Sequence, residues 1–290
     1  MLQKTVEKIL ESHNFAWSEW HGCFDIAARR KEMLLLKVLD NVDSFQEQQA
    51  LNLSTLSGSL DAFASVIGTH TRYEELNDNV IYERFSVPAF TPETLDSILS
   101  SETPFLYRAR GGMFSDVDPK ALHKAREKAG LSQSQLAGAV GVSKKNIYEH
   151  ERMQKKARSE VVERIEKELG AQITLPFVPA SLKSETTVKS EDAFEISVAK
   201  ELRRIGFEAG FVRQSPFNII AKEKFLIISE AGSDVRKLRK KLPHLAEFSE
   251  VSRKPTLVIT EKELDADLPV VERRHLKEMS AKELRKIARK

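Results

Sequence analysis

The segment from Pro119 to Gly170 constrains the fold most, because three short helices separated by sharp turns can be read from it. The first helix ends at Gly130, which supplies the backbone freedom that a helix end needs. Ser132 and Ser143 are suited to cap a second and a third helix, since a serine hydroxyl can accept a hydrogen bond from a free backbone amide. Gly141 lies between these two helices and allows a tight turn. The pattern predicts a compact helical unit whose third helix is exposed.

Polar and basic residues gather on the predicted third helix and around it. In helix-turn-helix modules the N-terminal end of this helix enters the major groove of DNA. Lysine can donate to guanine, asparagine can pair with adenine, and tyrosine can reach a phosphate or a thymine methyl group. Each residue alone would more often be a solvated side chain, but their placement on one surface favours DNA binding. The candidate DNA-binding residues are Gln133, Ser134, Ser143, Lys144, Lys145, Asn146, Tyr148, Arg152 and Lys155.

The run LSQSQLAGAVGVSKKNIYEHE, residues 131–151, resembles the Cro/C1 repressor class of helix-turn-helix domains. In that class an arginine of the first helix commonly pairs with a glutamate that closes the third helix. The resemblance implies a mostly buried pair of Arg126 and Glu151 here. The flanking runs FDIAARR, LLLKVLDNVDSF, VIYERFSVPAFTPETL and YRARGGMF extend the resemblance over essentially the whole chain, to an archaeal family of Cro/C1-type transcriptional regulators.

Charge is distributed unevenly along the chain. Residues 1–118 contain ten Lys and Arg against 18 Asp and Glu, residues 119–170 contain 12 against 7, and residues 171–290 contain 24 against 18. A phosphate backbone repels the acidic N-terminal part and attracts the other two parts. Contact with nucleic acid is therefore expected in the middle and C-terminal parts.

Turn-forming and polar stretches divide the chain into domains. A Gly-Gly step at Gly111 and Gly112 indicates a hairpin that leads into the helical unit. A stretch rich in Pro, Ser, Thr and charge follows that unit and has no hydrophobic period. The predicted organisation is an acidic α/β domain at 1–118, the helix-turn-helix domain at 119–175, a linker at 176–192 and a second, basic α/β domain at 193–290.

The two outer domains have similar patterns, which indicates a duplication. Each begins with an amphipathic helix and continues with a short strand, FDIAA at 24–28 and FNIIA at 217–221. A second apolar strand, a polar helix and a buried strand follow in both. The predicted fold class is α+β multidomain, with a central all-α module between two related α/β domains.

The first outer domain, at FDIAARRKEMLLLKV, resembles the core of the restriction-endonuclease-like fold. Active members place an Asp on one strand and an acid-x-Lys on the next, because a divalent metal needs hard oxygen ligands beside the basic group. Asp25 and Lys37 could fill two of these positions, but Leu35 stands where the second acid is needed. In the second domain Asn218 replaces the Asp, and Ser229 stands near the Lys position. We therefore expect degenerate domains without a catalytic or metal site.

The remaining composition fits a protein without disulfides or a membrane segment. Cys23 is the single cysteine, which excludes an intrachain disulfide and a cysteine-rich zinc site. The longest apolar run, around 33–39, is too short to span a bilayer, and the N-terminus carries acids where a signal peptide is apolar. A cytoplasmic location is expected, and the absence of a phosphate loop or cofactor fingerprint predicts no cofactor.

The leading hypothesis is a sequence-specific transcriptional regulator that binds double-stranded DNA. A single helix-turn-helix reads only a few base pairs, so we expect a homodimer on a two-fold site. One alternative is a metal-dependent nuclease targeted by the central module, for which Asp25 and Lys37 are the motivation. Another is an antitoxin-like interaction protein that binds DNA to control its own promoter.

Overall fold

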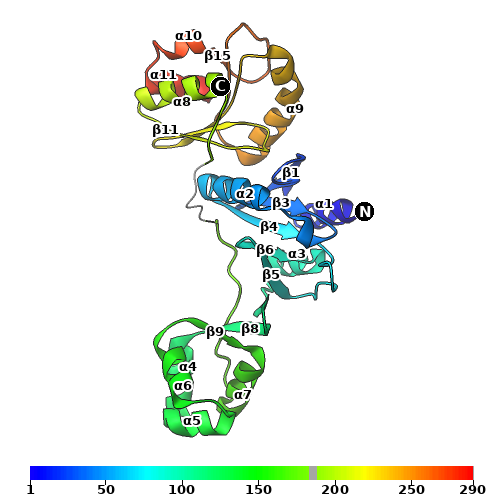
Figure 1. The fold of residues 1–290 in the computed structure, drawn as a ribbon, viewed down its shortest axis with the longest axis vertical. Coiled ribbons are helices and arrows are strands. Elements are labelled where there is room, and N and C mark those ends of the chain that lie inside the picture. Colours follow the sequence, from blue (N-terminus) through cyan, green and yellow to red (C-terminus); the bar gives the residue numbers. More distant parts are fainter. Residues whose placement is uncertain (183–187, 290) are drawn as a thin grey trace. The chain divides into compact units, whose positions relative to one another are not determined.

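The computed structural model describes residues 1–182 and 188–289 (Figure 1). Contacts divide the chain into two units, which are described separately below. The first unit comprises Met1–Ile67, Phe85–Val87 and Ala180–Lys290, and the second comprises Gly68–Arg84 and Pro88–Pro179. Residues 183–187 of the predicted linker lie outside the described residues, and the domain boundaries set from the sequence stay a prediction. Within the described residues, no helix combines the length and apolar character needed to cross a membrane.

The first unit begins with an α/β domain. Its elements are α1 (Leu2–Ser12), β1 (Ala16–Glu19), β2 (Ile26–Arg29), β3 (Met33–Val38), a 3₁₀ turn (Val42–Ser44), α2 (Glu47–Leu60) and β4 (Ala62–Ile67). β2 pairs antiparallel with both β1 and β3, whereas β3 and β4 are parallel because α2 returns the chain between them. β3 and β4 are apolar and almost wholly buried, as strands covered on both faces are.

The C-terminal part of the first unit repeats this order. Its elements are α8 (Ala193–Arg204), β11 (Glu208–Phe211), β12 (Ile219–Lys222), β13 (Leu226–Gly232), α9 (Val235–Ser252), β14 (Thr256–Thr260), β15 (Val270–Glu272), α10 (Arg273–Leu276) and α11 (Ala281–Ala288). β12 is antiparallel to β11 and β13, and β13 is parallel to β14, as in the N-terminal domain. The two α/β domains therefore share one topology.

The strand registers of the two domains match, which fixes the corresponding residues. Asp25 corresponds to Asn218, each lying one residue before its strand. Lys37 corresponds to Glu230. The sequence comparison placed Ser229 near the lysine position, and the register corrects this by one residue, because backbone pairing and not side-chain pattern decides it.

Within the first unit the two domains contact one another through α9, which packs on β1 and β2. The Phe248 ring lies between Phe24, at 5.8 Å between ring centroids, and Phe217, at 5.0 Å. The Trp20 indole Nε1 donates to the backbone oxygen of Gln214 at 3.0 Å. Three buried aromatic rings thus join the domains at corresponding positions, since Phe24 and Phe217 match in the repeat.

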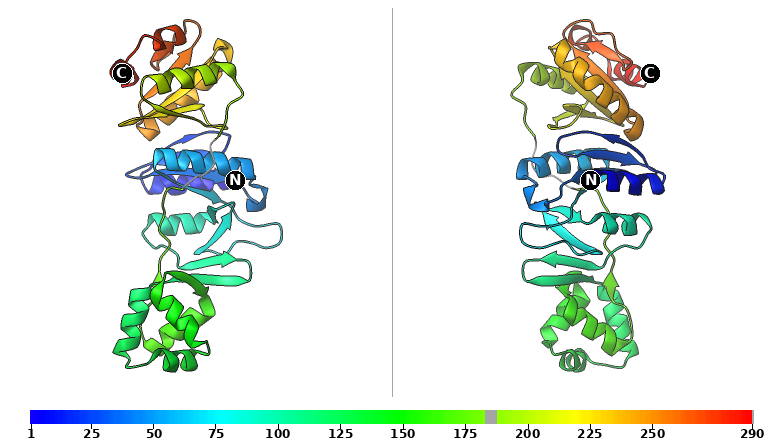
Figure 2. Two further views of the ribbon diagram at one scale, coloured as in Figure 1. Left: turned by 60° about the vertical axis from the view of Figure 1, so that its left-hand side comes forward. Right: turned by 90° about the vertical axis from the view of Figure 1, so that its right-hand side faces the viewer.

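The second unit contains short strands and the central helices. The elements from residue 80 to 175 are β5 (Val80–Arg84), β6 (Val87–Phe90), α3 (Pro92–Leu99), β7 (Leu106–Ala109), β8 (Gly112–Val117), α4 (Pro119–Lys128), α5 (Gln133–Val140), α6 (Lys144–Arg152), β9 (Lys155–Arg158), α7 (Ser159–Leu169) and β10 (Thr174–Leu175). β7 and β8 form an antiparallel hairpin in which Gly111 and Gly112 have φ of 100° and 135°. β9 and β10 both pair antiparallel with β8. Figure 2 shows from two further sides that α4 to α7 form one bundle.

Candidate nucleic-acid interface

The central helices begin and end where side chains satisfy free backbone groups. The Ser132 hydroxyl accepts from the amide of Gln135, whose side chain bonds back to the Ser132 amide. The Ser143 hydroxyl accepts from the third amide of α6 at 3.2 Å. Gly141 ends α5 in the left-handed region with φ of 72°, which a residue with a Cβ adopts only at a cost. These local interactions set the tight turn between α5 and α6.

A small apolar core holds the helices and strands of the module together. Ala137 of α5 is buried, and its small side chain allows the neighbouring helices to approach closely. Strand residues from β8 and β9 contribute to the same core, so the module includes a short sheet beside the helices. The core residues are Val117, Leu122, Leu136, Ala137, Val140, Ile147, Ala157, Val162, Ile165 and Ile173.

Glu151, at the end of α6, is the central acceptor of a buried polar network. Arg126 of α4 donates to both its carboxylate oxygens, with Nη2 to Oε2 at 3.1 Å. Gln133 Nε2 donates to the same Oε2 at 2.8 Å, and His123 Nδ1 lies 3.2 Å from it. The side chains of Arg126 and Glu151 are only 10% and 5% exposed. The structure thus brings together the two residues that the family resemblance paired.

The network also determines the charge state of Glu151. Burial alone would raise the pKa of this carboxyl, but hydrogen bonds from Arg126, Gln133 and His123 outweigh burial and hold the pKa below its usual value. The hydrogen bond to Glu151 in turn raises the pKa of Arg126 above its ordinary value. Arg126 Nη1 also donates to the backbone oxygen of Leu131 at 2.8 Å, which ties α4 to the loop before α5. An ionised pair therefore connects the first, second and third helices.

The exposed surface of α6 carries several of the predicted contact residues. Lys144 and Lys145 are exposed in its first turn, and Ser134 is exposed on α5. Tyr148 is 44% exposed, and its hydroxyl accepts from Arg152 Nη1 at 2.6 Å. The Arg152 guanidinium also lies 5.4 Å from the centre of the Tyr148 ring. This contact fixes the tyrosine on the outer surface and involves neither Lys144 nor Lys145.

Two of the lysines predicted to contact DNA, Lys145 and Lys155, lie beside an acidic residue of the module. Glu149 accepts from Lys155 Nζ at 2.7 Å and lies 3.8 Å from Lys145 Nζ. The hydrogen bond from Lys155 lowers the pKa of Glu149, which keeps this carboxylate ionised. Lys155 is the first residue of β9, a strand that the sequence analysis did not predict, because four residues reading KKAR give no apolar strand pattern. Either lysine must leave this carboxylate in order to contact DNA.

Other residues of the module point inward. The Gln133 amide is committed to Glu151, and it is half-buried. Asn146 Oδ1 and His150 Nδ1 are buried and have no hydrogen-bond partner among the described residues. Burial, reinforced by the charge of Lys155, lowers the pKa of His150, so this imidazole is neutral at pH 7. The sequence analysis missed His150, although its position three residues after Ile147 on the inner face of α6 is a signal.

The N-terminal domain places Asp25 and Lys37 in a closed ion pair. Lys37 Nζ donates to Asp25 Oδ1 and to the Gly22 oxygen, each at 2.9 Å. Asp25 Oδ2 accepts from the backbone amide of Val38 at 2.8 Å. Leu35, at the position of the second acid, is fully buried. Both oxygens of Asp25 thus have protein donors, and the neighbouring position offers no oxygen ligand for a metal.

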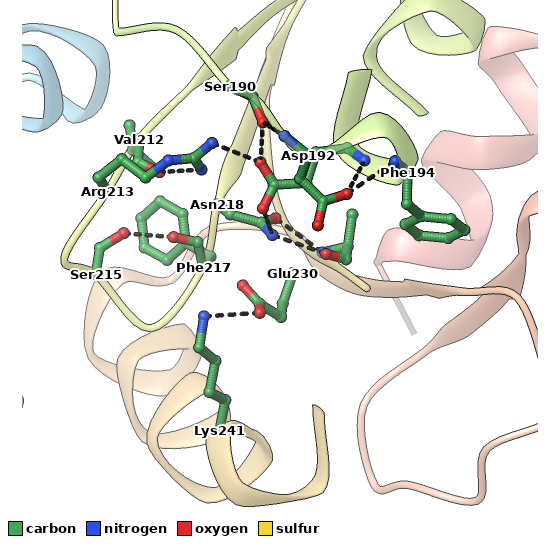
Figure 3. Close-up of polar contacts among 12 residues, drawn as sticks. Ser190, Asp192, Phe194, Val212, Arg213, Ser215, Phe217, Asn218, Glu230 and Lys241 are labelled. Carbon is green, nitrogen blue, oxygen red and sulfur yellow. Dashed lines mark hydrogen bonds and ion pairs between the residues drawn. The ribbon is translucent and has the colours of Figure 1, made fainter. Parts of the chain in front are cut away.

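The corresponding place in the C-terminal domain holds a different polar cluster (Figure 3). Asn218 bridges strands and helix, since its Nδ2 donates to Glu195 Oε1 at 2.8 Å and its Oδ1 accepts from the amide of Ala231 at 2.8 Å. Arg213 and Ser190 donate to the other oxygen of Glu195 at 2.7 and 2.6 Å. Every oxygen of Glu195 is thus taken up by the protein.

Glu230 completes this cluster at the position of the nuclease lysine. Lys241 of α9 reaches it, with Nζ 2.8 Å from Oε1, as Figure 3 shows. Its Oε2 is buried and has no hydrogen-bond partner among the described residues. Burial raises the pKa of Glu230 to about 7, although Lys241 opposes the shift. In the described part of the chain, no group of three or more His, Cys, Asp or Glu residues is arranged to hold a metal ion.

The fold and the module define a multidomain α/β protein with a helix-turn-helix domain in its middle. Two family models match separate parts of the chain. The PD-(D/E)XK superfamily domain matches residues 1–105, and the helix-turn-helix model matches residues 122–175. No solved structure matches the chain.

Several archaeal proteins are similar over most of this chain. A Pyrococcus furiosus protein is 36% identical over 231 residues, which are 77% of this chain and 73% of the relative. A Thermococcus kodakarensis protein is 31% identical over 291 residues, covering 96% and 91%, and a Methanococcus maripaludis protein is 30% identical over 313 residues, covering 99% and 93%. All three carry the provisional name HTH-type transcriptional regulatory protein. The chain belongs to this family, as the sequence resemblance predicted.

Proposed function

We propose that this protein is a transcriptional regulator that binds double-stranded DNA and reads its sequence with the N-terminal end of α6. The observation that carries the proposal is the exposed first turn of α6, where Lys144 and Lys145 follow the cap Ser143. In helix-turn-helix complexes this turn faces the base edges of the major groove. The match of the module and the names of the relatives support the same function.

The proposed contacts divide into two kinds. Lys144, Lys145 and Tyr148 reach base edges, whereas Ser134 and Lys155 contact phosphates. Gln133, Asn146 and Arg152 stay candidates, but Gln133 first serves Glu151, and the buried oxygen of Asn146 removes one half of a bidentate contact to adenine. We therefore assign sequence reading to the two lysines foremost.

The proposed active species is a homodimer. One module covers only a few base pairs, and useful specificity in a genome requires more. Two copies on a two-fold site would double the contacts, with the half-sites about one helical turn apart. Light scattering on the protein alone and on its DNA complex tests this state. A monomer in both would refute the dimer and leave the reading role of α6 untouched.

The proposal is tested by selecting bound duplexes from a random pool with the full chain. The selected site and a scrambled duplex are then compared for two variants. Lys145→Ala should reduce the preference for the selected site by roughly 1–3 kcal/mol, about 5- to 150-fold, as for the loss of a base contact. Lys167→Ala, an exposed lysine on α7, is the matched control and should leave the preference unchanged. Equal preference in all three proteins would contradict the assignment.

A second candidate function, DNA cleavage, follows from the PD-(D/E)XK match. We propose that the domain is not catalytic, because Lys37 and Val38 occupy both oxygens of Asp25 and Leu35 replaces the second acid. Incubating plasmid with the protein and Mg²⁺ or Mn²⁺ decides the matter. A regulator retards the plasmid without nicking it, whereas nicking that Asp25→Asn abolishes would establish a nuclease.

A further inference from the structure

The first half of α9 carries a dense group of exposed cations. From residue 235 to 246 the chain has five Lys and Arg and no Asp or Glu. Lys241 turns inward to Glu230. The other four are exposed, and no ion pair is found for them within residues 1–182 and 188–289. This α9 cation group consists of Arg236, Lys237, Arg239 and Lys240.

The position of these cations opposes the stability of the helix. The N-terminal end of a helix carries a partial positive charge, which disfavours basic residues in its first turn. Arg236 lies three and four residues before Arg239 and Lys240, where like charges face one another and repel. Asp234 caps the helix through two backbone amides, and Asp265 and Asp267 line the same pocket as Arg239. Packing does not require the group either, since α9 buries Leu245 and Phe248 instead.

The N-terminal domain provides an internal comparison. α2 occupies the same place in the same topology, between two parallel strands. Its sequence EQQALNLSTLSGSL contains no Lys or Arg, and Glu47 stands in its first turn. The fold therefore does not need cations at this position, and their presence on α9 calls for a polyanion that neutralises them.

We propose that the α9 cation group is a second DNA-contacting surface, which binds the phosphate backbone of duplex DNA without reading sequence. Residues 171–290 carry a net excess of six positive charges, which attracts the same ligand. Residues four apart on a helix lie about 6 Å apart along its axis, so the group spreads its charge along a backbone rather than around one ion. The inference rests on the proposed function, because it takes duplex DNA as the ligand of the chain.

The test measures binding of the full chain to a 30-base-pair duplex without the selected site, at several salt concentrations. The Lys237→Gln/Lys240→Gln variant removes two cations of the group. The Lys4→Gln/Lys8→Gln variant removes two exposed lysines from α1 and is the charge-matched control. Two lost phosphate contacts should reduce the salt slope by about 1.8 and weaken binding by up to roughly 60-fold at 0.1 M salt. The control should match the wild type.

Thermal unfolding separates binding from folding. Because Lys237 lies at the unfavourable end of the helix dipole and Lys240 is repelled by Arg236 four residues before it, the α9 variant should unfold at an unchanged or higher temperature. An α9 variant that binds duplex like the control overturns the inference and leaves the role of Lys145 intact. An effect on single-stranded RNA alone overturns it in favour of RNA. A wild type that binds no duplex at all overturns both proposals.

Discussion

Replacing Arg126 by Ala should destabilise the helix-turn-helix module more than any exposed substitution in it. Arg126 and Glu151 are both about nine-tenths buried, and Arg126 also holds the Leu131 oxygen. Removing one partner of a buried pair leaves an uncompensated charge, which costs roughly 3–5 kcal/mol. Gln133 and His123 still donate to Glu151, which favours the lower end of this range, about 3 kcal/mol.

The loss is best measured locally, because Trp17 and Trp20 both lie in the N-terminal domain and their fluorescence does not report on the module. Hydrogen exchange of peptides from α4, α5 and α6 reports the free energy of local opening. A loss of about 3 kcal/mol corresponds to a fall in protection of more than about 100-fold.

Lys124→Ala, at an exposed position of α4, is the matched control and should change the opening free energy by less than about 0.5 kcal/mol. Arg126→Met combined with Glu151→Leu removes both charges and should recover much of the loss. Protection in Arg126→Ala equal to that in the control would refute the reasoning that this network holds the helices together.

Three further predictions concern pH and packing. As the pH falls from 7 to 5, His150 takes up a proton in the unfolded chain before it does so in the folded one. The protection of α6 against hydrogen exchange should therefore decrease, and His150→Gln should abolish the decrease. The pH dependence that Glu230 contributes has the opposite sign. With its pKa at about 7, the folded carboxyl keeps a proton that the carboxyl of the unfolded chain releases above about pH 4.5. The protection of β13 against hydrogen exchange should therefore increase as the pH falls from 7 to 5, and it should stay constant in Glu230→Gln. A decrease in the wild type would contradict the raised pKa of Glu230. Gly22→Ala would place a Cβ 2.0 Å from a backbone oxygen of the C-terminal domain and 2.5 Å from Trp20 Nε1, so tryptophan emission should shift to the red. Gly210→Ala has open space around it and should leave the emission unchanged.

The module could be predicted from its sequence because local chemistry determines its boundaries. Ser132, Gly141 and Ser143 specify caps and a turn through interactions within a few residues, and the structure has the helices there. The strand β9 could not be predicted, since it exists only through pairing with β8, about 40 residues earlier in the chain.

The candidate site was harder to predict because side-chain direction depends on tertiary contacts. Gln133 has the composition of a phosphate contact, but the position of Glu151 turns its amide inward. The match of Lys37 with Glu230 needed the strand register, which the hydrophobic pattern alone does not give to within one residue.

In the proposed function, the first turn of α6 selects the sites at which this protein binds DNA. Genome-wide mapping of bound sites, for the wild type and for Lys144→Ala/Lys145→Ala, tests it most directly. If this turn reads the sequence, wild-type sites share one motif with two-fold symmetry, and the variant loses the motif while it keeps weak, unselective binding. Sites without a common motif, or an unchanged motif in the variant, would contradict it.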